Sequence, residues 1–337
     1  MMCGGWYAAT ADVAAGPPGE LKGCLSRAVS LYLLASITAS YLASSSAPTP
    51  LYPIYQGKWG YSPTAISFVF GIYAIAVLGA LLVAGRLSDY VGRRPILIAV
   101  TAIQAATMFV FAFADGLSDL IAARVIQGLA TGTGIAAVGA GMLDMDKARG
   151  AVANSVAPAG GTAVGGILAG LMVHYLPAPT HSVYFVLAAI FTAQVVGVLF
   201  IPELNPPRAG AIASLRPRFC LPAATRQPML TAAPVLIAVW ALAGFYGSLA
   251  PSLVRTSFAL DSSLAGGIAL FVLAGSGGIS VLLTQQLSAR TLMLYGPSAL
   301  LAGVGLVLAS LSYQSATAFF LGTALRKVRA THRISAN

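Results

Sequence analysis

Charged residues are scarce in this chain. Asp, Glu, Lys and Arg make up 8% of its 337 residues, against 58% hydrophobic residues and a mean hydropathy of +0.84. Soluble domains carry roughly 25% charged residues, so a soluble fold is excluded. The net charge is +10, but the basic residues are spread over short segments and not gathered with aromatic side chains, which argues against nucleic-acid binding. The composition indicates a helical membrane protein, with the lipid bilayer as its surroundings.

Motifs that carry catalytic or metal chemistry are also missing. The three cysteines, Cys3, Cys24 and Cys220, have a spacing that suits neither a metal site nor a disulfide framework. There is no G-x-x-x-x-G-K-[ST] phosphate loop, which excludes direct use of ATP, and neither an H-E-x-x-H nor a G-x-S-x-G motif. We therefore expect a protein that is not an enzyme and that uses no cofactor and no metal.

The chain has instead a series of long apolar runs. Residues 65–84 and 96–114 contain no Asp, Glu, Lys or Arg, and a helix of about 20 residues crosses the hydrocarbon core of a bilayer. We expect an all-α, polytopic transmembrane bundle of about nine full spans and a partial tenth. The first span could also be a signal peptide, because basic residues precede it and small ones follow. After this span we expect Pro48, Pro50 and Pro53 to bend the chain toward an outer loop from Tyr55 to Pro63. The expected spans are 28–47, 65–84, 96–114, 120–143, 151–173, 183–201, 231–250, 264–285 and 292–311, with the partial run at 316–325.

A short charged hinge connects the second and third runs. It reads Gly85-Arg86-Leu87-Ser88-Asp89-Tyr90-Val91-Gly92-Arg93-Arg94-Pro95, and its charges cannot lie in lipid. The glycines allow a sharp turn, and a proline is tolerated at the start of a helix. Asp89, beside Arg93 and Arg94, can form charge-assisted hydrogen bonds that hold neighbouring helices in one arrangement and release them in another. The simpler alternative is that the arginines only set the topology.

Basic residues between the expected spans lie almost all on one side of the membrane. With a cytoplasmic N-terminus, Lys58 and Arg255 fall outside and the rest fall inside. Because cytoplasmic loops carry an excess of Lys and Arg, we expect a multi-pass protein of the inner (plasma) membrane with its N-terminus in the cytoplasm. The residues placed inside are Lys22, Arg27, Arg86, Arg93, Arg94, Lys147, Arg149, Arg208, Arg216, Arg218, Arg226 and Arg290.

The hinge resembles the signature loop of the major facilitator superfamily, G-x-L-S-D-x-x-G-R-R-P. The resemblance extends over residues 28 to 325 and implies a secondary transporter with two six-span halves that rock about a central site. It also implies a cytoplasmic conformational latch, in which Asp144 or Asp146 at the inner end of the fourth span joins the hinge. The matching hinge residues are Gly85, Leu87, Ser88, Asp89, Gly92, Arg93, Arg94 and Pro95.

The expected domains follow from these spans. Residues 1–27 form a cytoplasmic tail, and 28–201 form an N-terminal six-helix bundle. Residues 202–229 alternate Pro with Arg, which predicts a cytoplasmic linker and not a continuous helix. An incomplete second bundle at 230–325 and a basic tail at 326–337 follow, so we expect a truncated C-terminal half.

Arg124 is the charged residue inside the fourth run, and a charge at mid-membrane costs roughly 2.5–3.5 kcal/mol. It begins an R-x-x-Q-G pattern, Arg124 to Gly128, which is similar to one in the fourth span of the family. We expect Arg124 to face a polar cavity; the alternative is that it snorkels to the outer surface beside Asp119. The candidate cavity residues, each of which could equally be a packing residue, are Tyr41, Ser45, Tyr73, Arg124, Gln127, Asn154, Trp240 and Tyr246.

The fifth run is crowded with small residues. Pro158 is expected to bend this helix, and Gly161 to permit close helix packing. Antiporters of the family carry G-P-x-x-G-G here, from which Ala157-Pro158-Ala159-Gly160-Gly161 departs, so antiport is only suggested.

Taken together, the sequence predicts secondary active transport of a small-molecule solute by alternating access, as a permease or an efflux carrier. We expect a monomer. Proton coupling is left open, because no acidic residue lies in the middle of a predicted span and the His residues lie in loops or the tail. The alternative is a truncated membrane remnant or partner subunit that does not transport; a channel or receptor is weaker, since no ring of charge is present.

Overall fold

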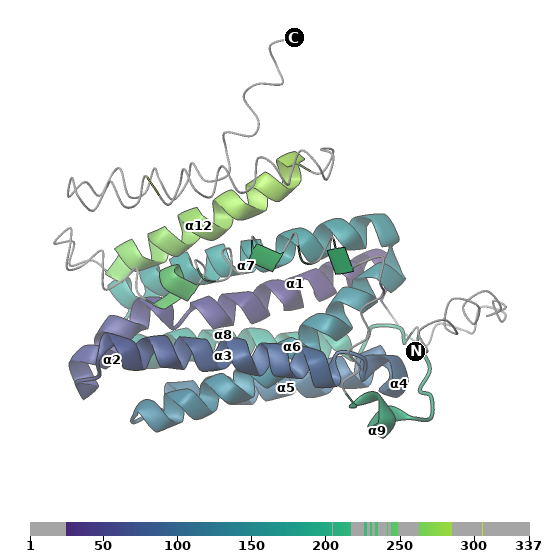
Figure 1. Cartoon of the computed structure of the whole chain (residues 1–337), viewed down its shortest axis with the longest axis horizontal. Coiled ribbons are helices and arrows are strands. Elements are labelled where there is room, and N and C mark those ends of the chain that lie inside the picture. Colours follow the sequence, from purple (N-terminus) through teal and green to yellow (C-terminus); the bar gives the residue numbers. More distant parts are fainter. Residues whose placement is uncertain are drawn as a thin grey trace, which may run out of the picture.

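A computed structural model describes residues 25–203, 205–216, 226–227, 230, 233–234, 241, 244–248, 263–284 and 305. All the elements within these residues are helices (Figure 1), as the sequence predicted. The elements are α1 Arg27–Ser46, η1 Thr49–Leu51, α2 Tyr52–Trp59, α3 Pro63–Ala84, α4 Ser88–Val91, α5 Arg93–Ala112, α6 Leu117–Met145, α7 Lys147–Tyr175, α8 Pro179–Val198, α9 Ala211–Ser214 and α12 Ser263–Thr284.

Seven helical stretches in the described residues are long and apolar enough to cross a membrane. They confirm the six spans predicted between residues 28 and 201 and the one predicted at 264–285, and the protein is a multi-pass membrane protein. The predicted spans at 231–250 and 292–311 and the partial tenth fall mostly or wholly outside the described residues. The seven stretches are Arg27–Trp59, Pro63–Ala84, Arg93–Ala112, Leu117–Met145, Lys147–Tyr175, Pro179–Val198 and Gly266–Leu283.

The prolines after α1 begin helices where we expected a loop. Sequence reasoning placed a loop from Tyr55 to Pro63, but α2 continues to Trp59, and Gly60 ends it with a φ of 69°. Pro50 and Pro53 are the second residues of η1 and α2, within the first turn of each. A proline lacks only an N–H that would have no partner in a first helical turn, so it can start a helix as readily as stop one.

The long helices α1, α3, α5, α6, α7 and α8 lie side by side in one bundle (Figure 1). α1 contacts α6, α7 and α8, while α3 packs on α6, and α5 packs between α6 and α8. Leu34, Ile37 and Tyr41 of α1 are at most 1% exposed and lie in the core. We call the end that carries residues 85–95, with α4 and α9, the hinge end, and the end that carries η1 and α2 the far end.

The glycines of α7 pack against two different helices, α1 and α12. Gly161 and Gly165 lie directly against the backbone of Ala39 and Ala43 in α1, where a Cβ atom would not fit. One residue further on, Gly166 faces α12, and a Cβ on Gly267 there would lie 2.6 Å from the Gly166 carbonyl oxygen. Small residues let helices approach closely within a membrane. α7 therefore joins the first half of the chain to α12, as Figure 1 shows.

This packing predicts opposite effects for neighbouring glycines. Gly161→Ala should lower the free energy of unfolding by about 1–3 kcal/mol, the usual cost of overpacking. Gly160→Ala is the matched control, because no atom lies within 4 Å of its added Cβ and alanine is favoured over glycine in a helix. Thermal unfolding in detergent checks this, and equal melting temperatures for the two variants would contradict the assigned α1–α7 contact.

Candidate functional site

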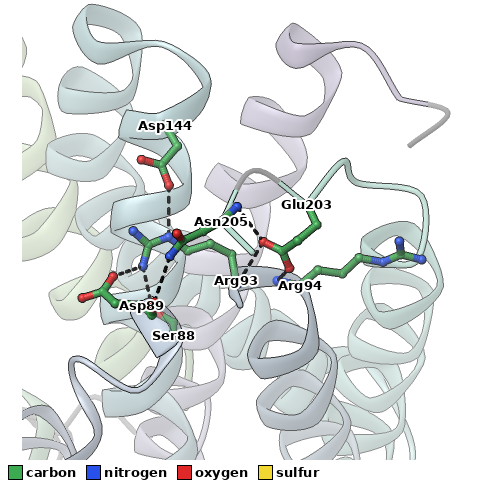
Figure 2. A network of polar contacts seen from close by, with 7 residues as sticks. All are labelled: Ser88, Asp89, Arg93, Arg94, Asp144, Glu203 and Asn205. Carbon is green, nitrogen blue, oxygen red and sulfur yellow. Dashed lines mark hydrogen bonds and ion pairs between the residues drawn. The ribbon is translucent and has the colours of Figure 1, made fainter. Parts of the chain in front are cut away.

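Arg93 is the centre of a polar network at the hinge end (Figure 2). Its Nη1 donates to Asp89 Oδ1 at 2.6 Å and to Ser88 Oγ at 2.8 Å, and its Nε donates to Asp144 Oδ2 at 3.0 Å. The side chain of Arg93 is 15% exposed, while Asp89 and Asp144 are 48% and 37% exposed. This hinge network of Ser88, Asp89, Arg93 and Asp144 therefore ties together α4, the start of α5 and the last turn of α6.

Glu203, just after α8, caps the start of α5. Its Oε1 accepts from the Arg93 N–H at 3.1 Å and its Oε2 accepts from the Arg94 N–H at 2.8 Å. Gly92, the residue before α5, has a φ of 106°, and a Cβ there would lie 3.0 Å from Glu203 Oε2. A carboxylate in this position satisfies free backbone N–H groups and complements the helix dipole. Gly92 thus supplies both the turn and the space for the carboxylate.

The chain after Glu203 stays bound to the hinge. The Asn205 N–H donates to Glu203 Oε1 at 3.1 Å, and its Nδ2 donates to the Asp89 carbonyl oxygen at 3.3 Å (Figure 2). Further on, the Arg208 N–H donates to the Tyr90 carbonyl oxygen at 2.7 Å. The start of the predicted linker is therefore fastened to the loop that carries the hinge network.

The predicted latch residues divide into two groups in the structure. Asp89, Arg93 and Asp144 are brought together, and Gly92 forms the turn beside them. Asp146 instead accepts from the Arg149 N–H at 2.9 Å as the N-cap of α7. The Arg94 guanidinium points away from Arg93 (Figure 2) and donates to the Leu199 carbonyl oxygen. Gly85 ends α3 and makes none of these contacts.

Sequence reasoning missed Glu203. The available signal was an acidic residue directly after the last apolar run of the first half. Its partners, however, lie 109 and 110 residues away in the chain. No local pattern could have identified them.

Arg124 of α6 forms a second polar cluster, inside the bundle. The side chain is 0% exposed. Its Nη1 donates to the Ser45 carbonyl oxygen at 3.1 Å and to Gln127 Oε1 at 2.7 Å, and its Nη2 donates to the Tyr52 hydroxyl at 2.5 Å. The Arg124 guanidinium carbon also lies 5.3–5.9 Å from the ring centres of Tyr52, Tyr73 and Phe111. None of the ion pairs in the described part of the chain involves Arg124.

The end of α1 explains how this cation is accommodated. Pro48 has no N–H to offer the Ser44 carbonyl four residues earlier, so that oxygen needs another donor. Gln127 Nε2 supplies it at 3.2 Å, while Arg124 serves the Ser45 carbonyl. The C-terminal end of a helix carries partial negative charge, which favours a nearby cation. Arg124 and Gln127 together cap the end of α1 from a neighbouring helix.

Arg124 does not snorkel to the outer surface beside Asp119, because its side chain is 0% exposed. Asp119 instead accepts a hydrogen bond from the Asp115 N–H. Tyr41 is buried, with its hydroxyl 2.7 Å from Thr101 Oγ1. Ser45 and Tyr73 lie beside Arg124, whereas Asn154 is exposed and faces Gly139.

The other predicted residues are placed as follows. Tyr246 is 1% exposed, and Trp240 lies outside the described residues. α7 runs on through Pro158. A groove of about 480 Å³ between α5 and α8 has a mainly apolar lining that includes Phe109 and Phe185, and no predicted site residue lines it. In the described part of the chain no cluster of His, Cys, Asp or Glu could hold a metal ion. Solute binding by the predicted residues stays a prediction.

The capping role predicts a measurable loss for Glu203→Gln. The variant keeps one amide oxygen as acceptor but removes the charge from the start of α5, which should cost about 0.3–2 kcal/mol of stability. Thermal unfolding at low ionic strength checks this. Asp115→Asn is the matched control, since Asp115 is an exposed loop carboxylate. If both variants melt like the parent, the Glu203 contacts contribute nothing to stability.

The sequence of the chain is similar to those of known proteins. One curated relative is the Cephamycin export protein CmcT of Amycolatopsis lactamdurans, 29% identical over 153 residues, which are 43% of this chain and 31% of the relative. The chain thus matches less than a third of the relative's length. The family model of the Major Facilitator Superfamily matches residues 34–326, a range that includes the hinge network and both halves of the α7–α12 contact. The chain therefore belongs to the Major Facilitator Superfamily.

Proposed function

We propose that this protein is a secondary active transporter that exports a small organic solute by alternating access. Membership of a transporter family supports transport in general, and the relative's name supports export. The hinge network is the observation that best supports the proposed alternating-access mechanism. It joins three helical elements through exchangeable ion pairs at one end of the bundle, which is what two alternative arrangements of the same helices require.

The strength of the hinge network suits a latch. Ion pairs with exposed partners contribute about 0.2–1 kcal/mol each, and Asp89 and Asp144 are both partly exposed. Two conformations that interconvert differ by only a few kcal/mol. The pairs of Arg93 can therefore bias such an equilibrium without making it irreversible.

The hinge end lies in the cytoplasm in this proposal. Arg86, Arg93 and Arg94 are concentrated there, and basic loops remain on the cytoplasmic side of the inner (plasma) membrane. The far end, with η1 and α2, then faces outward. Solute enters from the cytoplasm and leaves past η1.

The driving ion has few candidate carriers in the described spans. Asp119 lies in the first turn of α6 and Asp144 lies in its last turn, so neither carboxylate is at the middle of the helix. A proton-coupled cycle in this half of the protein would have to use such end positions. Export by reconstituted vesicles with and without a proton gradient tests the coupling.

Asp89→Asn should cut the rate of solute export at least severalfold while leaving solute affinity unchanged, because it weakens the latch and touches no solute. The measurement is flux of a small organic solute such as a cephamycin into inside-out vesicles, with binding by the purified protein as the second readout. Arg86→Gln is the matched control in the same loop, since Arg86 is exposed.

Equal loss of binding and flux in Asp89→Asn would remove the latch role. Flux no greater than in protein-free vesicles, across several solute classes, would favour the alternative of a membrane protein that does not transport.

A further inference from the structure

At the far end, a hydrogen bond connects the two halves of the chain. The Thr49 hydroxyl, on η1, donates to the Gly247 carbonyl oxygen at 2.9 Å, although the two residues are 198 positions apart. Thr49 is 0% exposed. η1 also contacts α12 of the second half. η1 is thus one of the places where the far end of the first bundle meets the second half.

Gly247 is enclosed at this contact. The ring of Phe70, from α3, fills the space where a side chain would begin, and a Cβ on Gly247 would lie 2.7 Å from Phe70 Cζ. The backbone of the second half therefore approaches η1 on one side and α3 on the other. The carbonyl oxygen of Gly247 faces Thr49 and accepts the hydrogen bond of its hydroxyl.

Arg124 binds one residue that precedes η1 in the chain and one that follows it. The Ser45 carbonyl lies before η1 and the Tyr52 hydroxyl directly after it, and the same guanidinium binds both. Gln127 fixes the neighbouring Ser44 carbonyl. A planar guanidinium has its donors in a fixed fork, so it sets the relative position of two acceptors in a way that a lysine cannot. The buried cluster thus determines where Thr49 is presented.

We propose that η1 is the outer gate of the transport pathway, with Thr49 as its closing contact on Gly247 and Arg124 as the positioning residue behind it. This inference rests on the proposed function, in which the far end faces outward. Closure places the Thr49 hydroxyl on a backbone carbonyl of the second half. Opening separates Thr49 from Gly247 and exposes the end of α1. Arg124 maintains the conformation of η1 throughout, so that the contact can form again.

The size of the effect follows from the contact. A single neutral hydrogen bond changes an equilibrium between two states by about twofold to tenfold. Thr49→Val keeps the shape of the side chain and removes the hydroxyl donor. The variant should therefore populate the outward-open state about twofold to tenfold more than the parent.

Cysteine labelling measures this population. Ala47 lies beside η1 and is 2% exposed, so Ala47→Cys reports opening in a protein whose Cys3, Cys24 and Cys220 are replaced by serine. A membrane-impermeant maleimide is applied to right-side-out vesicles. Thr49→Val should raise the labelling rate of the introduced thiol about twofold to tenfold.

Thr38→Val is the matched control. Thr38 is on α1, is 1% exposed and has a hydroxyl without a hydrogen-bond partner, so its loss should leave the labelling rate unchanged. An unchanged rate in Thr49→Val, or an equal rise in both variants, would overturn the gate. Labelling only from the cytoplasmic side would overturn it as well.

A second variant tests the positioning residue. Arg124→Lys should also raise the labelling rate, and the double variant with Thr49→Val should label no faster than Thr49→Val alone, because both act on one contact. Elution of each variant as a single peak in detergent shows that it is folded. Additive effects would overturn the positioning role. Labelling does not require transport, so a protein with the predicted labelling and no flux keeps the gate and loses the proposed function.

Discussion

A guanidinium in or beside a bilayer must be given partners by the protein, and this requirement shapes both polar clusters described above. Arg93 and Arg124 meet it in different ways. Arg93 lies near the end of the spans and is paired with Asp89 and Asp144, which are partly exposed. Arg124 lies inside the bundle and is held by backbone carbonyls, an amide, a hydroxyl and aromatic faces. The first arrangement can exchange with water, whereas the second cannot.

In the proposed mechanism, this difference gives the two clusters different roles. The hinge network can break and reform, because water and other groups can replace each exposed carboxylate. Breaking the cluster of Arg124 would leave a buried cation without partners, which is strongly destabilising. Arg124 is therefore suited to hold the end of α1 and η1 fixed, and Arg93 to join and release α4, α5 and α6. In the proposed cycle, the hinge network is the part that rearranges and the cluster of Arg124 is the part that stays fixed.

The sequence was sufficient for the hinge and for the seven spans that lie within the described residues, since runs without charge must lie in lipid and the arginines between them must not. It was insufficient for Glu203 and for the partners of Arg124. Pro48 shows locally that the Ser44 carbonyl loses a donor, but only the packing of α6 on α1 shows that Gln127 replaces it. The helix at Tyr52–Trp59 was missed because prolines were taken to end helices, and here they begin them.

If the hinge network sets the balance between two arrangements of the helices, as we propose, a distance measurement across the hinge end should show it directly. Spin labels at exposed Arg86 and at exposed Leu283 on α12 report the separation of the halves by pulsed electron paramagnetic resonance. We expect two populations in the parent and a shift toward the longer distance in Asp89→Asn. A single distance, identical in parent and variant, would contradict this proposal.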